Sequence, residues 1–196
     1  MKINRRISFP RHSDYAKYKP LLREDFRHCC AYCGAHERIF GALRNMTIDH
    51  FRPKANFPNL LSEYANLYYC CGECNTYKGD RWPSDMELAD GFRFIDVCAE
   101  DSFDHLAFDD AAFVPLTNPG RFTVISLRLD RAELTRRHRE IATRFARICS
   151  ELSRIDDLRR KLDTAGDPAL KGQLDELHSE LIEDLREIIF PTPLVA

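Results

Sequence analysis

The sequence contains no apolar run that approaches the ~18 consecutive residues needed for a membrane-spanning helix, so we expect no membrane association. Its N-terminus, M-K-I-N-R-R-I-S-F-P, is basic but lacks the apolar segment of a secretory signal, which makes the cytoplasm the expected location. Internal repeats and low-complexity tracts are also missing. With 44% hydrophobic and 31% charged residues, the 196-residue chain has the composition of a globular protein with one sizeable core.

A strong charge of either sign is missing as well. The net charge is −2, which by itself predicts no affinity for nucleic acid. The charges are unevenly distributed, because residues 85–110 are acidic and contain Arg93 as their only Lys or Arg. A local basic surface can steer a polyanion even when the total charge is near zero, so the composition permits a nucleic-acid enzyme. Basic residues gather in and beside the segment 30–78: Arg23, Arg27, Arg38, Arg44, Arg52, Lys54, Lys78 and Arg81.

Eight cysteines are present, and their spacing divides them into two groups. C-A-Y-C begins at Cys30 and C-G-E-C begins at Cys71, so the chain carries two C-x-x-C pairs. Without a secretory signal, such pairs favour a tetrahedral zinc site over disulfides, and the alternative is a set of buried free thiols. We expect one structural zinc ion bound by Cys30, Cys33, Cys71 and Cys74, and four core cysteines, Cys29, Cys70, Cys98 and Cys149.

Short regular elements are expected between and after the two pairs. Met46–Ile48 is typical of a short strand that ends at Asp49-His50, and Asn66–Tyr69 is typical of a second strand that leads into Cys71. A helix is expected to begin after Cys74, over residues 75–79. The sequence therefore predicts two strands and a helix arranged around a metal ion.

The residues beside the cysteines suit phosphodiester hydrolysis. That reaction needs a base of near-neutral pKa to activate water, which His50 can supply. It also needs a cation to neutralise charge on the scissile phosphate and the leaving oxygen, and Asp49 and Asn75 offer the hard oxygen ligands that suit Mg²⁺. Neighbours in a strand point to opposite faces, so Asp49 and His50 can share one ion's surroundings only if the backbone bends there.

The pattern C-x-x-C, D-H-x-x-P, N-L and C-x-x-C-N-x-x-K over residues 30–82 resembles the HNH endonucleases of the ββα-metal fold. The resemblance implies that His50 is the general base and that Asn66 braces the loop that positions it. It also implies that Asn75, at a position where many members have His, binds one catalytic Mg²⁺ or Mn²⁺ together with Asp49. Loss of an imidazole there favours Mg²⁺ over softer metals.

Basic residues complete the expected site. The resemblance implies that Lys78 contacts phosphate. Arg52 and Lys54 follow His50 closely and are candidate contacts to phosphates flanking the cut, since such contacts supply most affinity without sequence information. The alternative for Arg52 and Lys54 is an ordinary solvated basic loop.

A wider similarity points to a biological setting. D-H-F-R-P-K at Asp49–Lys54, Y-K-G-D at Tyr77–Asp80 and S-L-R-L-D-R-x-x-L at Ser126–Leu134 are similar to bacterial HNH proteins of the Septu and retron-associated anti-phage type. In those systems the nuclease works with an ATPase, so the resemblance implies an ATPase partner. DNA is the expected substrate. Two alternatives stay open: an RNA (tRNA) endonuclease, and a zinc-stabilised module that binds nucleic acid or protein without cutting.

We predict an α+β fold in four parts. Residues 1–28 form an N-terminal arm and helix, and residues 29–95 form the HNH core held together by the four-cysteine zinc site. Residues 96–129 form an irregular acidic connector with a short strand at Phe122–Ile125, and residues 130–196 form an antiparallel helical hairpin. Within the last part, Gly166-Asp167-Pro168 interrupts the helical periodicity and supplies an N-cap and a first helical residue for the second helix.

The predicted hairpin has no catalytic signature. Its apolar stripe is expected to pack on its own domain, and the alternative is a protein interface, either with the partner or in a homo-oligomer through the hairpin. Arginines in its first half are further candidates for contact with nucleic acid: Arg131, Arg136, Arg137, Arg139, Arg144 and Arg147.

Overall fold

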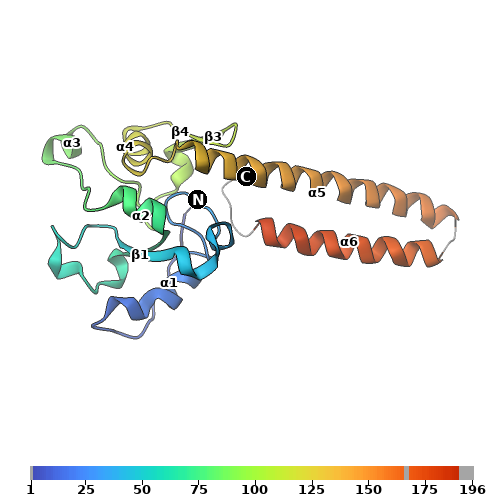
Figure 1. Ribbon diagram of the computed structural model, residues 1–196, viewed down its shortest axis with the longest axis horizontal. Coiled ribbons are helices and arrows are strands. Elements are labelled where there is room, and N and C mark those ends of the chain that lie inside the picture. The colour runs from blue at the N-terminus through green and yellow to red at the C-terminus, as the bar shows by residue number, and fades with distance from the viewer. Residues whose placement is uncertain (1, 166–167, 190–196) are drawn as a thin grey trace.

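A computed structural model describes residues 2–165 and 168–189 of the chain. Figure 1 shows a globular body from which a long pair of helices projects. The predicted α+β fold is confirmed, since small antiparallel strand pairs and helices together form the body. Among the described residues, none of the helices is both long enough and apolar enough to cross a membrane.

The predicted two strands and helix lie at the centre of the body. Strand β1, Met46–His50, pairs with β2, Leu67–Cys71, in an antiparallel register that sets Asp49 opposite Tyr68. Helix α2, Gly72–Lys78, follows β2 directly. It begins earlier than expected because the Cys71 side chain accepts a hydrogen bond from the Cys74 amide and so acts as its N-cap.

The N-terminal arm is bonded to the body and leads into the predicted helix. The 3-10 turn η1, Tyr15–Tyr18, leads into helix α1, Lys19–Asp25, with Pro20 in the first turn. The Ile3 amide donates to the Val97 carbonyl at 2.7 Å, and Ile3 is buried. The Arg5 guanidinium lies over aromatic rings and donates to the backbone carbonyls of Tyr64 and Leu67.

The connector contains the one secondary-structure prediction that is wrong in kind. Phe122–Ile125 was expected to be a strand but lies in helix α4, Asn118–Leu127. The Thr117 hydroxyl caps this helix by accepting from the Gly120 amide, and Pro119 lies in its first turn, so a strong start signal outweighs the strand preference of Phe-Thr-Val-Ile. The strands here are instead β3, Leu106–Asp109, and β4, Ala112–Pro115.

The arm, the predicted core and the connector share one hydrophobic core. Buried residues from all three regions pack together around the four expected zinc ligands. The remaining short elements cover this core: α3 Asp85–Ala89 and the 3-10 turns η2 Glu37–Phe40, η3 Ala42–Asn45, η4 Pro58–Leu60, η5 Tyr64–Asn66 and η6 Ser102–Asp104. Asn66 was expected to begin the second strand, but it is the last residue of η5 and β2 begins at Leu67.

The C-terminal helices agree with the predicted hairpin. Helix α5, Ala132–Ala165, and helix α6, Pro168–Ile189, run side by side in opposite directions (Figure 1), and Arg144 of α5 pairs with Asp184 of α6. At 1.5 Å per residue, α5 is about 50 Å long. The predicted interruption at Gly166-Asp167 and the last residues, 190–196, lie outside the described residues.

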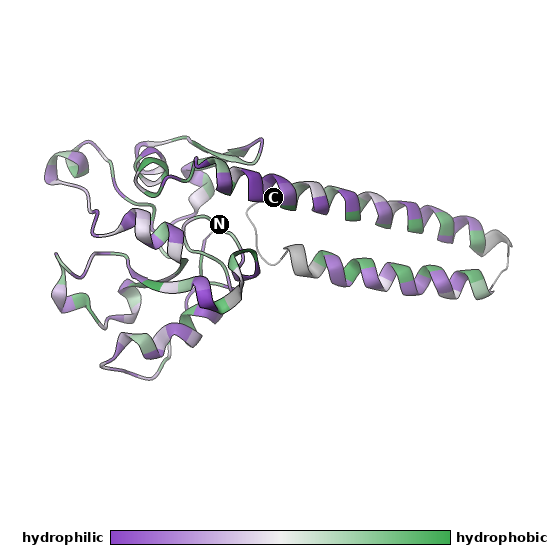
Figure 2. Cartoon of the chain, viewed as in Figure 1, coloured by the Kyte–Doolittle hydropathy of each residue, from purple (hydrophilic) through white to green (hydrophobic). Residues whose placement is uncertain are grey.

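Helices α5 and α6 bury only part of their apolar residues. Ile148, Ile155 and Leu174 are buried between them, and Figure 2 shows hydrophobic residues alternating with hydrophilic ones along both helices. Other leucines of the hairpin stay largely exposed: Leu158, Leu170 and Leu177.

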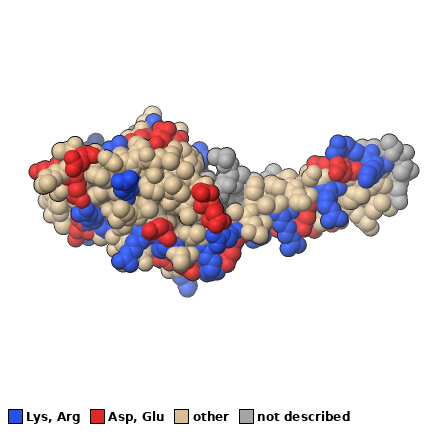
Figure 3. All heavy atoms as spheres, turned by 90° about the horizontal axis from the view of Figure 1, so that it is seen from above, with Lys and Arg blue, Asp and Glu red and all other residues tan. Residues whose placement is uncertain are grey.

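The arginines in the first half of the hairpin are paired with acidic groups. Figure 3 shows basic and acidic side chains interspersed along the projecting helices. The prediction that these arginines form a basic surface for nucleic acid is therefore not supported, because nearby carboxylates offset their charge. The pairs are Arg131–Glu73, Arg136–Glu133, Arg137–Glu133, Arg139–Asp110, Arg144–Asp184 and Arg147–Glu151.

Candidate active site

The two C-x-x-C turns meet as predicted. The four sulfur atoms lie within 4.8 Å of one another, and all four residues are buried. This is the donor set and the spacing of a tetrahedral structural zinc site, in which each sulfur lies about 2.3 Å from the ion. The residues are Cys30 and Cys33 from the turn after α1, and Cys71 and Cys74 at the start of α2.

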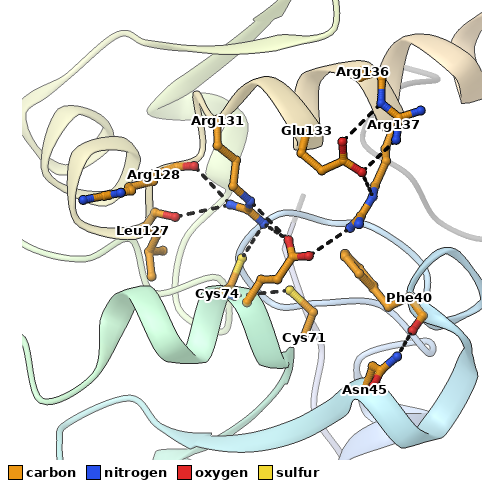
Figure 4. A network of polar contacts seen from close by, with 11 residues as sticks. Phe40, Asn45, Cys71, Cys74, Leu127, Arg128, Arg131, Glu133, Arg136 and Arg137 are labelled. Atoms are coloured by element: carbon orange, nitrogen blue, oxygen red, sulfur yellow. Dashed lines mark hydrogen bonds and ion pairs between the residues drawn. The ribbon is translucent and has the colours of Figure 1, made fainter.

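An arginine from the hairpin borders the zinc site. Arg131 Nη2 lies 3.6 Å from Cys74 Sγ and 3.2 Å from a carboxylate oxygen of Glu73. Figure 4 shows Arg131 directed toward Cys74. Burial lowers the pKa of this guanidinium, but the negative charge of the nearby Cys74 and Cys33 sulfurs raises it by more, so the pKa is raised overall. Its charge offsets part of the net negative charge that four thiolates leave around a divalent ion.

The histidine at the end of β1 is held in one orientation. His50 is 7% exposed, and its Nε2 lies 2.9 Å from the Leu61 carbonyl oxygen. Because a carbonyl oxygen only accepts, this contact makes Nε2–H the donor and leaves Nδ1 as the nitrogen that can take part in proton transfer. With Nε2 as the donor, Nδ1 is the nitrogen that can act as a general base. The Tyr15 ring packs edge to face against the imidazole, with ring centroids 4.7 Å apart.

Asn66 connects two loop segments that follow this histidine. Its side-chain oxygen accepts from the Arg52 amide at 2.8 Å, and its side-chain nitrogen donates to the Arg52 carbonyl at 3.0 Å. The same nitrogen lies 3.4 Å from the carbonyl of Leu60, next to the Leu61 carbonyl that holds His50. One buried amide thus connects the segment after β1 with the segment that orients the ring, which is the geometry expected of a bracing residue.

Asp49 is held from two sides. Its Oδ2 accepts a hydrogen bond from the Tyr32 hydroxyl, and Lys78 Nζ lies 3.1 Å from its Oδ1 and 3.0 Å from its Oδ2. Burial and the Asp49 carboxylate raise the pKa of Tyr32 well above its usual value, so the phenol keeps its proton and donates.

The expected phosphate contact of Lys78 is not supported. The side chain is only 1% exposed, and Nζ donates to the His50 carbonyl at 2.8 Å as well as to Asp49. An ammonium buried in this way pairs with the carboxylate because an unpaired charge there would be costly. Lys78 therefore positions Asp49 and the end of β1 from the protein interior, where a phosphate cannot reach it.

Asp49, His50 and Asn75 line one cleft of ≈ 260 Å³. Both Asp49 and His50 still lie within β1, and the backbone bends only after them, at residues 51–52. Lys54 also lines it, whereas Arg52 is not among the lining residues and lies over the rings of Phe57 and Trp82. The complete lining is Tyr15, Thr47, Ile48, Asp49, His50, Pro53, Lys54, Asn75, Gly79 and Asp80.

The donor set of the cleft fits a hard divalent cation. Asp49 offers a carboxylate and Asn75 an amide oxygen, and such oxygen ligands suit Mg²⁺ or Mn²⁺. A carboxylate has about four lone-pair sites, so its bonds to Tyr32 and Lys78 leave room for an ion. Sequence reasoning missed Asp80, a further carboxylate that lines the cleft, as well as Tyr15 and Tyr32.

Two short antiparallel strands followed by a helix, with His50, Asp49 and Asn75 at one cleft and a separate four-cysteine cluster, form the arrangement expected from the resemblance to the ββα-metal class. Residues 30–81 match the family model described as HNH endonuclease. This segment is therefore an HNH domain, as the motif pattern predicted, and HNH endonucleases are a family of hydrolases.

Two known proteins resemble longer parts of the chain. A Septu protein PtuB from Bacillus thuringiensis is 36% identical over 61 residues, which cover 31% of this chain and 23% of that protein. A Septu protein PtuB from Bacillus mycoides (strain KBAB4) is 25% identical over 203 residues, which cover 88% of this chain and 66% of that protein. The chain thus spans less than two thirds of either relative.

Proposed function

We propose that the protein is a metal-dependent endonuclease that cuts DNA in bacterial anti-phage defence. The observation that carries this proposal is the shared cleft, which His50 lines together with Asp49 and Asn75, two residues with oxygen donors. A module that only binds has no need of an oriented base next to a metal-ligand pair. The defence setting rests on the similarity to the two Septu proteins.

His50 is assigned the role of general base. Nδ1 takes a proton from the attacking water, and the Leu61 carbonyl stabilises the resulting imidazolium through the Nε2–H bond. Asn66 keeps the ring and the carbonyl in register. Misplacement of a catalytic group by about 1 Å can cost on the order of 100-fold in rate, which explains a dedicated brace.

Asp49 and Asn75 are assigned to one Mg²⁺ or Mn²⁺ ion. When bound, such an ion supplies charge neutralisation at the scissile phosphate and the leaving 3′-oxygen, which predicts a 5′-phosphate on the product. Lys54 lies at the cleft and is placed to hold the substrate backbone. Arg52, exposed beside the cleft, is assigned to a phosphate farther along the strand.

An ATPase is the proposed partner, by analogy with Septu-type systems, and the hairpin is the proposed surface for it or for a second copy of the chain. The exposed leucines of α5 and α6 support an interface of this kind. The cytoplasm is the proposed location.

The test is cleavage by the purified, zinc-loaded protein. Supercoiled plasmid and total RNA are incubated separately with Mg²⁺, Mn²⁺ or EDTA, with His50→Ala as the inactive variant. His178→Ala is the matched control, since His178 lies on the hairpin away from the cleft. We expect metal-dependent plasmid cleavage that falls about 100- to 10,000-fold in His50→Ala and is unchanged in His178→Ala.

The other outcomes assign the alternatives. Cleavage of RNA alone would replace DNA as the substrate, since the site contacts phosphate and not sugar. Absence of cleavage both alone and with the ATPase partner, in a folded zinc-loaded protein, would leave the non-cleaving binding module as the better account.

A further inference from the structure

The expected structural zinc site and the proposed catalytic ion site are connected through the residues that contact Asp49. Asp49 makes two side-chain contacts: with the hydroxyl of Tyr32 and with Nζ of Lys78. Tyr32 is the third residue of the first zinc turn, C-A-Y-C, between Cys30 and Cys33.

The second contact also originates at a zinc turn. Helix α2 begins immediately after Cys71, contains Cys74 and ends at Lys78. Both groups that hold the Asp49 carboxylate are therefore carried on backbone that the four cysteines fix. A zinc ion bound there would determine where the catalytic carboxylate lies.

Tyr32 has little freedom to move away from this contact. It is 6% exposed, and its ring is stacked on that of Tyr68, with centroids 6.3 Å apart. Tyr68 lies opposite Asp49 in the β1–β2 pairing. The backbone of the same turn is bonded to β2 as well, because the Ala31 amide donates to the Tyr69 carbonyl at 2.8 Å. The phenol is thus aimed at the carboxylate by the sheet and the zinc turn together.

We propose that Tyr32 is a positioning residue which couples the zinc turn to the catalytic ion by fixing the Asp49 carboxylate. This proposal rests on the proposed function, since it assigns Asp49 to the ion. Hydrogen bonds to a metal-bound carboxylate orient it, and their loss typically weakens metal binding about 10- to 100-fold.

The test measures binding of Mn²⁺ to the zinc-loaded full chain by calorimetry. Mn²⁺ binds thiolate sites more weakly than Zn²⁺ and therefore leaves the four-cysteine site occupied. Tyr32→Phe removes the hydroxyl and keeps the stacked ring. Tyr69→Phe is the matched control, because Tyr69 is also buried, lies near a zinc ligand and donates its hydroxyl to another carboxylate, Glu37, at 2.6 Å.

We expect Tyr32→Phe to raise the dissociation constant for Mn²⁺ about tenfold, with unchanged zinc content and with cleavage restored at high Mn²⁺ concentration. Tyr69→Phe should bind Mn²⁺ as the unmodified protein does. Equal Mn²⁺ affinity in Tyr32→Phe and the unmodified protein would overturn the coupling, as would equal weakening in both tyrosine variants.

Asp49→Ala separates failure of this inference from failure of the proposed function. If Asp49→Ala abolishes Mn²⁺ binding while Tyr32→Phe leaves it intact, the ion site stands and the role of Tyr32 falls. If the unmodified protein binds no Mn²⁺, or if Asp49→Ala binds it equally well, both the ion site and the coupling are wrong.

Discussion

The brace formed by Asn66 offers a quantitative prediction that links stability to activity. Asn66→Ala removes two hydrogen bonds to the backbone of Arg52, at 2.8 and 3.0 Å, and a longer one to the Leu60 carbonyl at 3.4 Å. Each of the two shorter bonds contributes roughly 0.5–1.5 kcal/mol to folding. The free energy of unfolding should therefore fall by about 2 kcal/mol, which leaves a protein of ordinary stability folded.

The expected loss of activity is larger than this destabilisation explains. With the brace gone, the Leu60–Leu61 segment is free to move, and the carbonyl that holds His50 Nε2 moves with it. We expect the cleavage rate of fully folded Asn66→Ala to fall at least tenfold because the base is no longer held in one orientation. Urea unfolding followed by circular dichroism gives the stability, and plasmid cleavage at a temperature well below the transition gives the rate.

Two further variants test the reasoning. Asn66→Asp keeps an acceptor for the Arg52 amide but loses the donor toward the two carbonyls, so it should impair activity as strongly as Asn66→Ala. Asn59→Ala changes an exposed asparagine in the same loop and should alter neither quantity. A destabilised Asn66→Ala that cuts at the full rate would refute the link between the brace and His50.

Three other perturbations have definite expected outcomes. Gly120→Ala would place a Cβ 2.1 Å from the His105 carbonyl oxygen and should lower the free energy of unfolding by about 1–3 kcal/mol, as measured by chemical unfolding. Gly172→Ala is the control, because no atom lies within 4 Å of its added Cβ, and it should stabilise α6 by up to about 1 kcal/mol. Equal changes in the two variants would contradict the packing argument. Burial raises the pKa of Glu37, but bonds from Arg23 and Tyr69 outweigh it and lower the pKa to about 2 from 4.5. The resulting stabilisation, about 3 kcal/mol, is complete above pH 4.5 and is lost as the pH falls toward 2, so Glu37→Gln should flatten acid unfolding in that window; an unchanged acid limb would refute it. Arg131→Met should speed the loss of zinc to a chelator and Arg136→Met should not, since Arg131 alone of the two contacts Cys74; equal zinc release would contradict a role for this contact.

The ββα segment was predictable because its signals are local. Each C-x-x-C turn brings two ligands together over four residues, and the strand before each chemical group is short and apolar. The resemblance also implied that Asp49, His50 and Asn75 would lie close together, and they line one cleft. Phe122–Ile125 is helical and not a strand because the cap at Thr117 and Pro119 in the first turn outweigh the strand propensity of these residues.

Lys78 shows why the orientation of a charged residue was not predictable. In the sequence Lys78 follows Asn75, the expected ligand of the catalytic ion, by three residues, and the resemblance implied that it contacts phosphate. Its environment depends on residues far along the chain, since Asp49 precedes it by 29 positions and the Phe94 ring lies 5.6 Å from Nζ. Burial inverts the role of the charge, which then stabilises a carboxylate of its own protein and is withheld from the substrate.

Arg131 extends this argument to the hairpin. Four thiolates around Zn²⁺ leave a net negative charge in a buried site, and such a charge is costly unless a cation lies nearby. The sequence establishes that need but offers six arginines at the start of the hairpin, and only the docking of α5 decides between them. Arg131 lies 57 residues after Cys74 and contacts its sulfur, so the start of the hairpin touches the second zinc turn. Helix α2 begins at this turn and ends at Lys78, whose ammonium pairs with Asp49. A partner that moved the base of this hairpin would act directly on the backbone that carries the proposed active site.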